Sequence, residues 1–126
     1  MIYEKLISTV NSAAEILENS RDVDIKNEKQ LEKLVWKVSA ELEYALFLFS
    51  VLHPNKLKAP KKLDAKTKSL DIESTLALVQ NLLNEVREAL KRKEELEAYQ
   101  RTWTAREHLF RVKGEIEKRL KQEKSK

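Results

Sequence analysis

The chain contains no cysteine, one glycine, two prolines and two histidines among its 126 residues. The absence of cysteine excludes disulfides, thiolate nucleophiles and cysteine-based zinc or iron–sulfur sites. A single glycine cannot build the glycine-rich loops that cradle nucleotide phosphates, because those loops need several positions without a side chain. Two histidines cannot form a three-histidine metal centre. We therefore expect no metal and no cofactor.

Long hydrophobic runs are also missing. The longest apolar stretch covers residues 44–52, far fewer than the ~20 residues that span a bilayer. The first residues lack the basic and apolar regions of a signal peptide. These features predict a soluble, cytoplasmic protein without a membrane segment, and nothing in the sequence indicates a small-molecule substrate.

Charge is abundant and unevenly spread. Charged residues make up 37% of the chain and the formal net charge is +4, a composition that is typical of thermophilic proteins when cysteine is absent. Residues 53–68 hold six basic residues and one acidic residue, and residues 91–126 hold twelve basic and seven acidic residues. Such positive regions are either solvated surface or binding surfaces for an anionic partner.

Apolar residues recur at helical spacing along nearly the whole chain, and we find no strand pattern. The predicted fold class is all-α, an antiparallel four-helix bundle in one domain, residues 1–126. The helices are expected over residues 2–19, 28–52, 71–98 and 105–122, with a frayed tail over residues 121–126. A basic, proline-containing connector, residues 53–69, is longer than the usual link of roughly 2–8 residues between helices.

Some helix ends have local signals. Asn27 and Gln30 have the spacing of a capping box, Asp71 or Ser69 can cap the third helix, and Pro54 ends the second. Gly114 inside the last helix suggests a close approach of another helix.

The boundary between the last two helices has two alternatives. The apolar phase of the third helix fails at Lys93 and Glu97, and Thr104 followed by Glu107 has the spacing of a capping box that would start a fourth helix. The alternative is a three-helix variant in which one long, kinked C-terminal helix rotates its buried face.

The second expected helix carries more apolar side chains than one bundle can cover. Tyr44, Phe47, Leu48 and Val51 lie off its core stripe, and a helix that is apolar all round must be buried all round. Exposed apolar patches usually mark interfaces. We therefore expect a homo-oligomer or a protein partner to bind these four residues, the alternative being that leucines of the connector cover them.

Aromatic and basic residues are interleaved near the C-terminus. If this segment is helical, Trp103, Arg106 and Phe110 share one face, where rings could stack on bases while arginine and lysine contact phosphates. The same spacing is first of all typical of a core, which is the interpretation we favour for the rings. The candidate contacts to RNA or DNA phosphates are Lys56, Lys58, Lys61, Lys62, Arg101, Arg106, Arg111 and Lys113.

Arg101 and His108 are separated by six residues. This spacing is similar to the motif of HEPN-type helical domains, in which four to six residues lie between an arginine and a histidine. Many of these domains are RNases that act as dimers. The resemblance implies that both residues lie at a dimer cleft and polarise the scissile phosphate. It covers only these residues and the all-helical outline, and Thr102 stands where the family often has Asn, Asp or His.

These observations favour a non-enzymatic helical binding module. We expect it to self-associate or to join a protein complex, with a basic surface that contacts nucleic-acid phosphates. Two alternatives stay open: a purely structural subunit of a protein complex, and a HEPN-like dimeric RNase that uses Arg101 and His108. No serine has a plausible histidine and acid around it.

Overall fold

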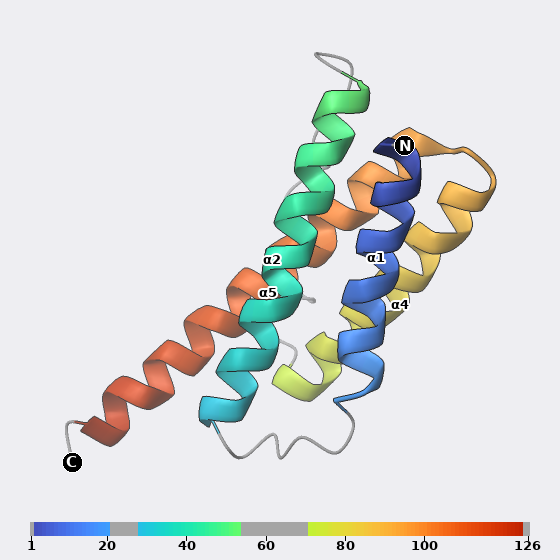
Figure 1. Cartoon of the computed structure of the whole chain (residues 1–126). Coiled ribbons are helices and arrows are strands. Elements are labelled where there is room, and N and C mark those ends of the chain that lie inside the picture. The colour runs from blue at the N-terminus through green and yellow to red at the C-terminus, as the bar shows by residue number, and fades with distance from the viewer. Residues whose placement is uncertain (1, 21–27, 54–70, 125–126) are drawn as a thin grey trace.

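The computed structural model describes residues 2–20, 28–53 and 71–124. These ranges form four helices and contain no strand (Figure 1): α1 Ile2–Glu18, α2 Glu28–Leu52, α4 Ile72–Lys91 and α5 Glu95–Lys124. The all-α helical bundle predicted from the apolar spacing is confirmed for this part of the chain.

Each helix packs against two neighbours. α1 lies beside α2 and α4, and α5 packs against the same two helices (Figure 1). Leu6 and Phe49 belong to one core cluster, while Leu17 and Leu31 belong to another. The start of α1 therefore packs against the end of α2, and the end of α1 packs against the start of α2. The two helices run in opposite directions.

The core consists of two clusters of buried side chains. The cluster near the start of α1 includes Leu6, Phe49 and Leu90, and the hydroxyl of Tyr3 donates to the carbonyl oxygen of Leu90. The rings of Phe49 and Tyr99 meet edge to face with their centroids 5.6 Å apart. The second cluster fills the other end of the bundle, and its fully buried members include Val38, Leu42, Val79, Leu83 and Leu109.

Leu48 lies in the core, so the prediction that it belongs to an outer surface is wrong. Its side chain is 5% exposed and packs in the cluster of Ala45 and Phe49. The physical reason is that α2 contacts α1 on one flank and α5 on the other. Its buried arc is therefore wider than the single stripe assumed from the sequence.

Asp71 is the N-cap of α4, which confirms one of the two predicted caps, Asp71 and Ser69. Its side chain accepts a hydrogen bond of 2.7 Å from the backbone N–H of Ser74, which satisfies a donor that the helix leaves unpaired. Hydrogen bonding from Ser74 holds the pKa of the Asp71 carboxyl below its ordinary value. The capping box predicted at Asn27 and Gln30 depends on Asn27, which lies outside the described residues.

The chain turns between α4 and α5 earlier than predicted. The N–H of Glu94 donates to the carbonyl oxygen of Ala89 at 2.9 Å, and the N–H of Lys93 donates to that of Leu90 at 3.1 Å. These two bonds are the pair found in a Schellman C-cap. Lys93, with a φ of 59°, occupies the left-handed position that glycine usually takes. The break is sharp although no glycine or proline marks it.

The helix boundaries predicted at residues 98 and 105 are therefore wrong, and so is the single long helix. Thr104 lies inside α5, where its hydroxyl donates to the carbonyl oxygen of Gln100 at 2.9 Å. A threonine hydroxyl inside a helix can bond to the carbonyl oxygen four residues earlier. The spacing of Thr104 and Glu107 therefore does not mark a helix start. Gly114 does not mark a close approach either, since an added methyl group would meet no neighbouring helix within 4 Å.

Candidate interaction surface

Four of the seven exposed large apolar residues in the described part of the chain lie on α2. Trp36, Tyr44, Phe47 and Val51 expose 65%, 46%, 59% and 42% of their surfaces. Their spacing of eight, three and four residues places them on one side of the helix. We call this side, together with the exposed Ala40 between Trp36 and Tyr44, the outer face of α2.

The two halves of this outer face differ in chemistry. Its N-terminal half carries exposed lysines, Lys29, Lys33 and Lys37. Its C-terminal half carries Tyr44 and Phe47, whose ring centroids lie 6.4 Å apart. The N-terminal half is therefore mainly basic around Trp36, with Glu32 beside Lys33 and Lys37. The C-terminal half is aromatic, and the small Ala40 lies between the two halves.

Helix α5 extends the surface sideways. The guanidinium of Arg106 donates to the carboxylate of Glu43 on α2 at 3.1 Å. The same guanidinium carbon lies 5.2 Å from the ring centroids of Trp103 and of Phe110. Phe110 is 43% exposed. An exposed ring of α5 is thus held next to α2 by an arginine that is itself bound to α2.

The register between the two helices can be followed from this ion pair. Lys113, seven residues beyond Arg106, lines the same small cavity as Trp36, which precedes Glu43 by seven residues. α2 and α5 are therefore antiparallel. Arg106 lies at the level of Glu43, and Lys113 lies at the level of Trp36. Between these points, Phe110 lies at the level of Ala40 to within one residue, a distance of about 1.5 Å along the axis.

Three of the four predicted interface residues lie on the outer face, and Leu48 does not. The apolar pattern did not indicate Trp36 or Phe110 as exposed residues of this surface. Trp36 follows Val35, which belongs to the core stripe. Because successive residues of a helix are rotated by about 100°, this position places the Trp36 ring off that stripe. Phe110 was expected in the core, but its neighbour Leu109 takes the buried position.

Arg101, a predicted phosphate contact, is bound within the chain. Its Nη1 donates to Glu85 of α4 at 2.6 Å, and its Nε donates to Glu97 at 3.1 Å. Hydrogen bonds with Glu94 and with Arg101 hold the pKa of the Glu97 carboxyl below its ordinary value. An approaching phosphate would have to compete with two carboxylates for this guanidinium.

The other predicted phosphate contacts are not gathered into one site in the described part of the chain. Arg106 is bound to Glu43, and Arg111 donates to the hydroxyl of Thr75 at 2.7 Å. Lys113 is exposed. The remaining four lie in the connector, outside the described residues: Lys56, Lys58, Lys61 and Lys62.

His108 is buried in α5, with 2% of its surface exposed. The arrangement that the HEPN resemblance implies needs this imidazole and Arg101 to reach one phosphate in an open cleft. Of these two residues, only Arg101 reaches solvent. The geometry therefore does not favour the RNase hypothesis.

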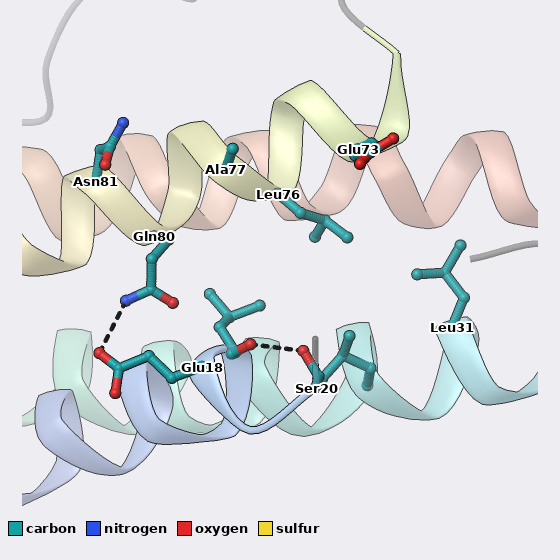
Figure 2. Close-up of a pocket in the computed structure, with 10 residues that line it drawn as sticks. Glu18, Ser20, Leu31, Glu73, Leu76, Ala77, Gln80 and Asn81 are labelled. Carbon is teal, nitrogen blue, oxygen red and sulfur yellow. Dashed lines mark hydrogen bonds between the residues drawn. The ribbon is translucent and has the colours of Figure 1, made fainter. Parts of the chain in front are cut away.

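A cavity of about 470 Å³ lies between α1, α2 and α4 (Figure 2). Leu17, Leu31 and Leu76 form part of its wall. The Glu18 carboxylate at its rim accepts a hydrogen bond from the Gln80 side chain at 3.4 Å. Its polar groups do not converge on one point, as they do in sites that orient a ligand, so we do not assign it a function.

Two further classes of site are absent from the residues described. No group of three or more histidine, aspartate or glutamate side chains is placed to hold a metal ion there. None of the four helices combines the length and the apolar character needed to cross a membrane.

Comparisons with protein-family models, with curated proteins and with solved structures give no match to this chain.

Proposed function

We propose that this chain is a non-enzymatic interaction module that assembles with copies of itself through the outer face of α2. The observation that carries the proposal is the alignment of Trp36, Tyr44, Phe47 and Val51 on one exposed side of a single helix. Exposed apolar residues scattered singly need no explanation, whereas contiguous patches mark interaction sites.

The size of the surface supports this function. At ~200 Å² for each aromatic side chain, the exposed fractions of Trp36, Tyr44 and Phe47 correspond to roughly 340 Å². Val51, Phe110 and the aliphatic stems of the three lysines enlarge the surface further. A standard stable interface buries roughly 800 Å² on each partner, so the aromatic rings supply a large part of that area and the residues around them supply the rest.

Two other functions have less support. Binding to nucleic acid requires cations along one surface. Among the predicted phosphate contacts that the structure describes, Arg101, Arg106 and Arg111 are bound to residues of the chain itself, and only Lys113 is exposed. The other four lie in the connector, outside the described residues. RNA cleavage requires an accessible His108, which is buried. A purely structural role in a protein complex is consistent with the same outer face, and differs only in the identity of the partner.

Light scattering on the full chain and on two matched variants tests the proposal. Phe47→Glu places a charge at the centre of the aromatic half, and Ala77→Glu makes the same change in charge at an exposed position of α4. We expect the unmodified chain and Ala77→Glu to have a mass that is a multiple of 14.8 kDa. Phe47→Glu should have the mass of the single chain, because a buried unpaired charge is strongly unfavourable.

The result that would contradict the proposal is a Phe47→Glu variant with the same mass as the unmodified chain. Addition of a short RNA or DNA at low and high salt extends the same measurement. A complex that forms at low salt and is lost at high salt would instead support phosphate contacts, because such contacts release counterions.

A further inference from the structure

The outer face of α2 is complementary to itself when two copies run in opposite directions. If the two helices cross at Ala40, Lys33 lies at the level of the partner's Phe47, and Trp36 lies at the level of the partner's Tyr44. Ammonium groups are attracted to the faces of aromatic rings. Parallel helices would instead place each lysine beside its own copy, where like charges repel.

Ala40 is also the residue best suited to the crossing point. It is the one small side chain on the outer face between Trp36 and Tyr44, and a small residue allows two helix axes to approach closely. Phe110 on α5 lies at the same level, so its exposed ring falls beside the crossing point. Ala40 is therefore flanked by exposed rings on both helices, those of Trp36 and Tyr44 on α2 and that of Phe110 on α5.

We infer that the second copy packs its α2 antiparallel to the first, with a two-fold axis between the two Ala40 residues and with Phe110 beside that axis. This inference rests on the proposed self-association and adds the partner surface and its geometry. A two-fold arrangement uses the same patch on both copies and closes without open ends. It buries Trp36 and Phe47 of both chains and leaves no aromatic half of the outer face uncovered.

Disulfide formation between single introduced cysteines tests this geometry, because the natural chain has no cysteine. Contacting helices lie roughly 8–10 Å apart and each Cα lies about 2.3 Å from its axis. Two facing residues at the crossing point are therefore roughly 3.5–5.5 Å apart, which overlaps the range of about 4.4–6.8 Å in disulfides. Ala40→Cys in the full chain should form a covalent dimer on mild oxidation.

Lys29→Cys is the matched control, since it lies on the same helix and the same face. In the antiparallel dimer its two copies are about 33 Å apart, so it should stay non-covalent under the same conditions. Ser50→Cys reports on a dimer whose axis lies nearer the end of α2, and it should also fail to cross-link. Circular dichroism of each reduced variant establishes that the helices are intact.

Each outcome separates the geometry from the proposed function. Cross-linking of Ala40→Cys alone, together with a dimer mass for the unmodified chain, supports both. A dimer mass with cross-linking at Ser50→Cys, at Lys29→Cys or at none of the three positions overturns the antiparallel geometry and leaves self-association intact. A single-chain mass at every concentration overturns the proposed function itself, and the geometry with it.

Discussion

Arg106 on α5 binds Glu43 on α2 through an ion pair of 3.1 Å, while its guanidinium carbon lies 5.2 Å from the ring centroids of both Trp103 and Phe110. This contact joins α2 to α5 and places Phe110 beside the outer face of α2. The side chain of Arg106 is 19% exposed and that of Glu43 is 49% exposed, so the arginine end of the ion pair is the one removed from solvent. Ion pairs and cation–π contacts are stronger where water is excluded.

Replacement of Arg106 should therefore destabilise the fold. We expect Arg106→Gln to lower the free energy of unfolding by about 1–2 kcal/mol, because it removes the ion pair and the cation–π contacts together. Urea unfolding followed by circular dichroism measures the change. Arg92→Gln is the control, since Arg92 pairs with Glu94 at an exposed position and surface changes usually stay within about 0.5 kcal/mol. Equal effects of the two substitutions would show that Arg106 does not link the helices.

The turn between α4 and α5 should be stabilised by glycine. Lys93 has a φ of 59°, a conformation that costs residues with a Cβ roughly 1 kcal/mol and costs glycine almost nothing. We expect Lys93→Gly to raise the free energy of unfolding by about 0.5–1 kcal/mol in chemical denaturation. Lys91→Gly, inside the last turn of α4, should lower it by about 1 kcal/mol. A loss of stability in both variants would contradict the C-cap described above.

Gly114 in α5 is a second position where stability can be gained. An added methyl group meets no neighbouring helix within 4 Å, and alanine has a higher helix propensity than glycine by about 1 kcal/mol. Gly114→Ala should therefore raise the melting temperature by roughly 2–6 °C in calorimetry. A lower melting temperature would mean that glycine is required at this point of the helix.

The N-cap of α4 predicts a pH dependence. The pKa of Asp71 is lowered from 3.8 by hydrogen bonding from Ser74, so the folded state favours the ionised carboxyl. Its contribution to stability is present above pH 3.8 and is lost as the pH falls through the lower pKa of the folded state. Asp71→Ala should therefore lower the melting temperature at neutral pH, and this difference should shrink in strong acid. A difference that grows on acidification would contradict the assigned cap.

The helices could be predicted because their apolar spacing repeats locally. The cap at Asp71 was among the alternatives for the same reason, since an aspartate before an apolar stripe acts within one turn. The turn at Lys93 was harder, because a lysine in the left-handed conformation leaves no signal in composition. The failure of the apolar phase at Lys93 marked the correct place, and the spacing of Thr104 and Glu107 outweighed it.

The surface chemistry was less predictable because it depends on partners distant in the sequence. Arg101 is bound to Glu85 and Arg106 to Glu43, and neither pairing can be read from a single helix. Leu48 was misplaced because the number of helices around α2 decides how much of its circumference is buried. The exposure of Phe110 depends on the rotation of α5 about its axis, because a shift of one residue decides whether Leu109 or Phe110 is buried.

Sedimentation equilibrium of the unmodified full chain is the most direct measurement of the central claim, that the outer face of α2 joins two copies. We predict that the apparent mass rises with concentration from 14.8 kDa towards twice that value. A mass of 14.8 kDa at every concentration would contradict the account, because the outer face of α2 would then have no copy of itself to cover it.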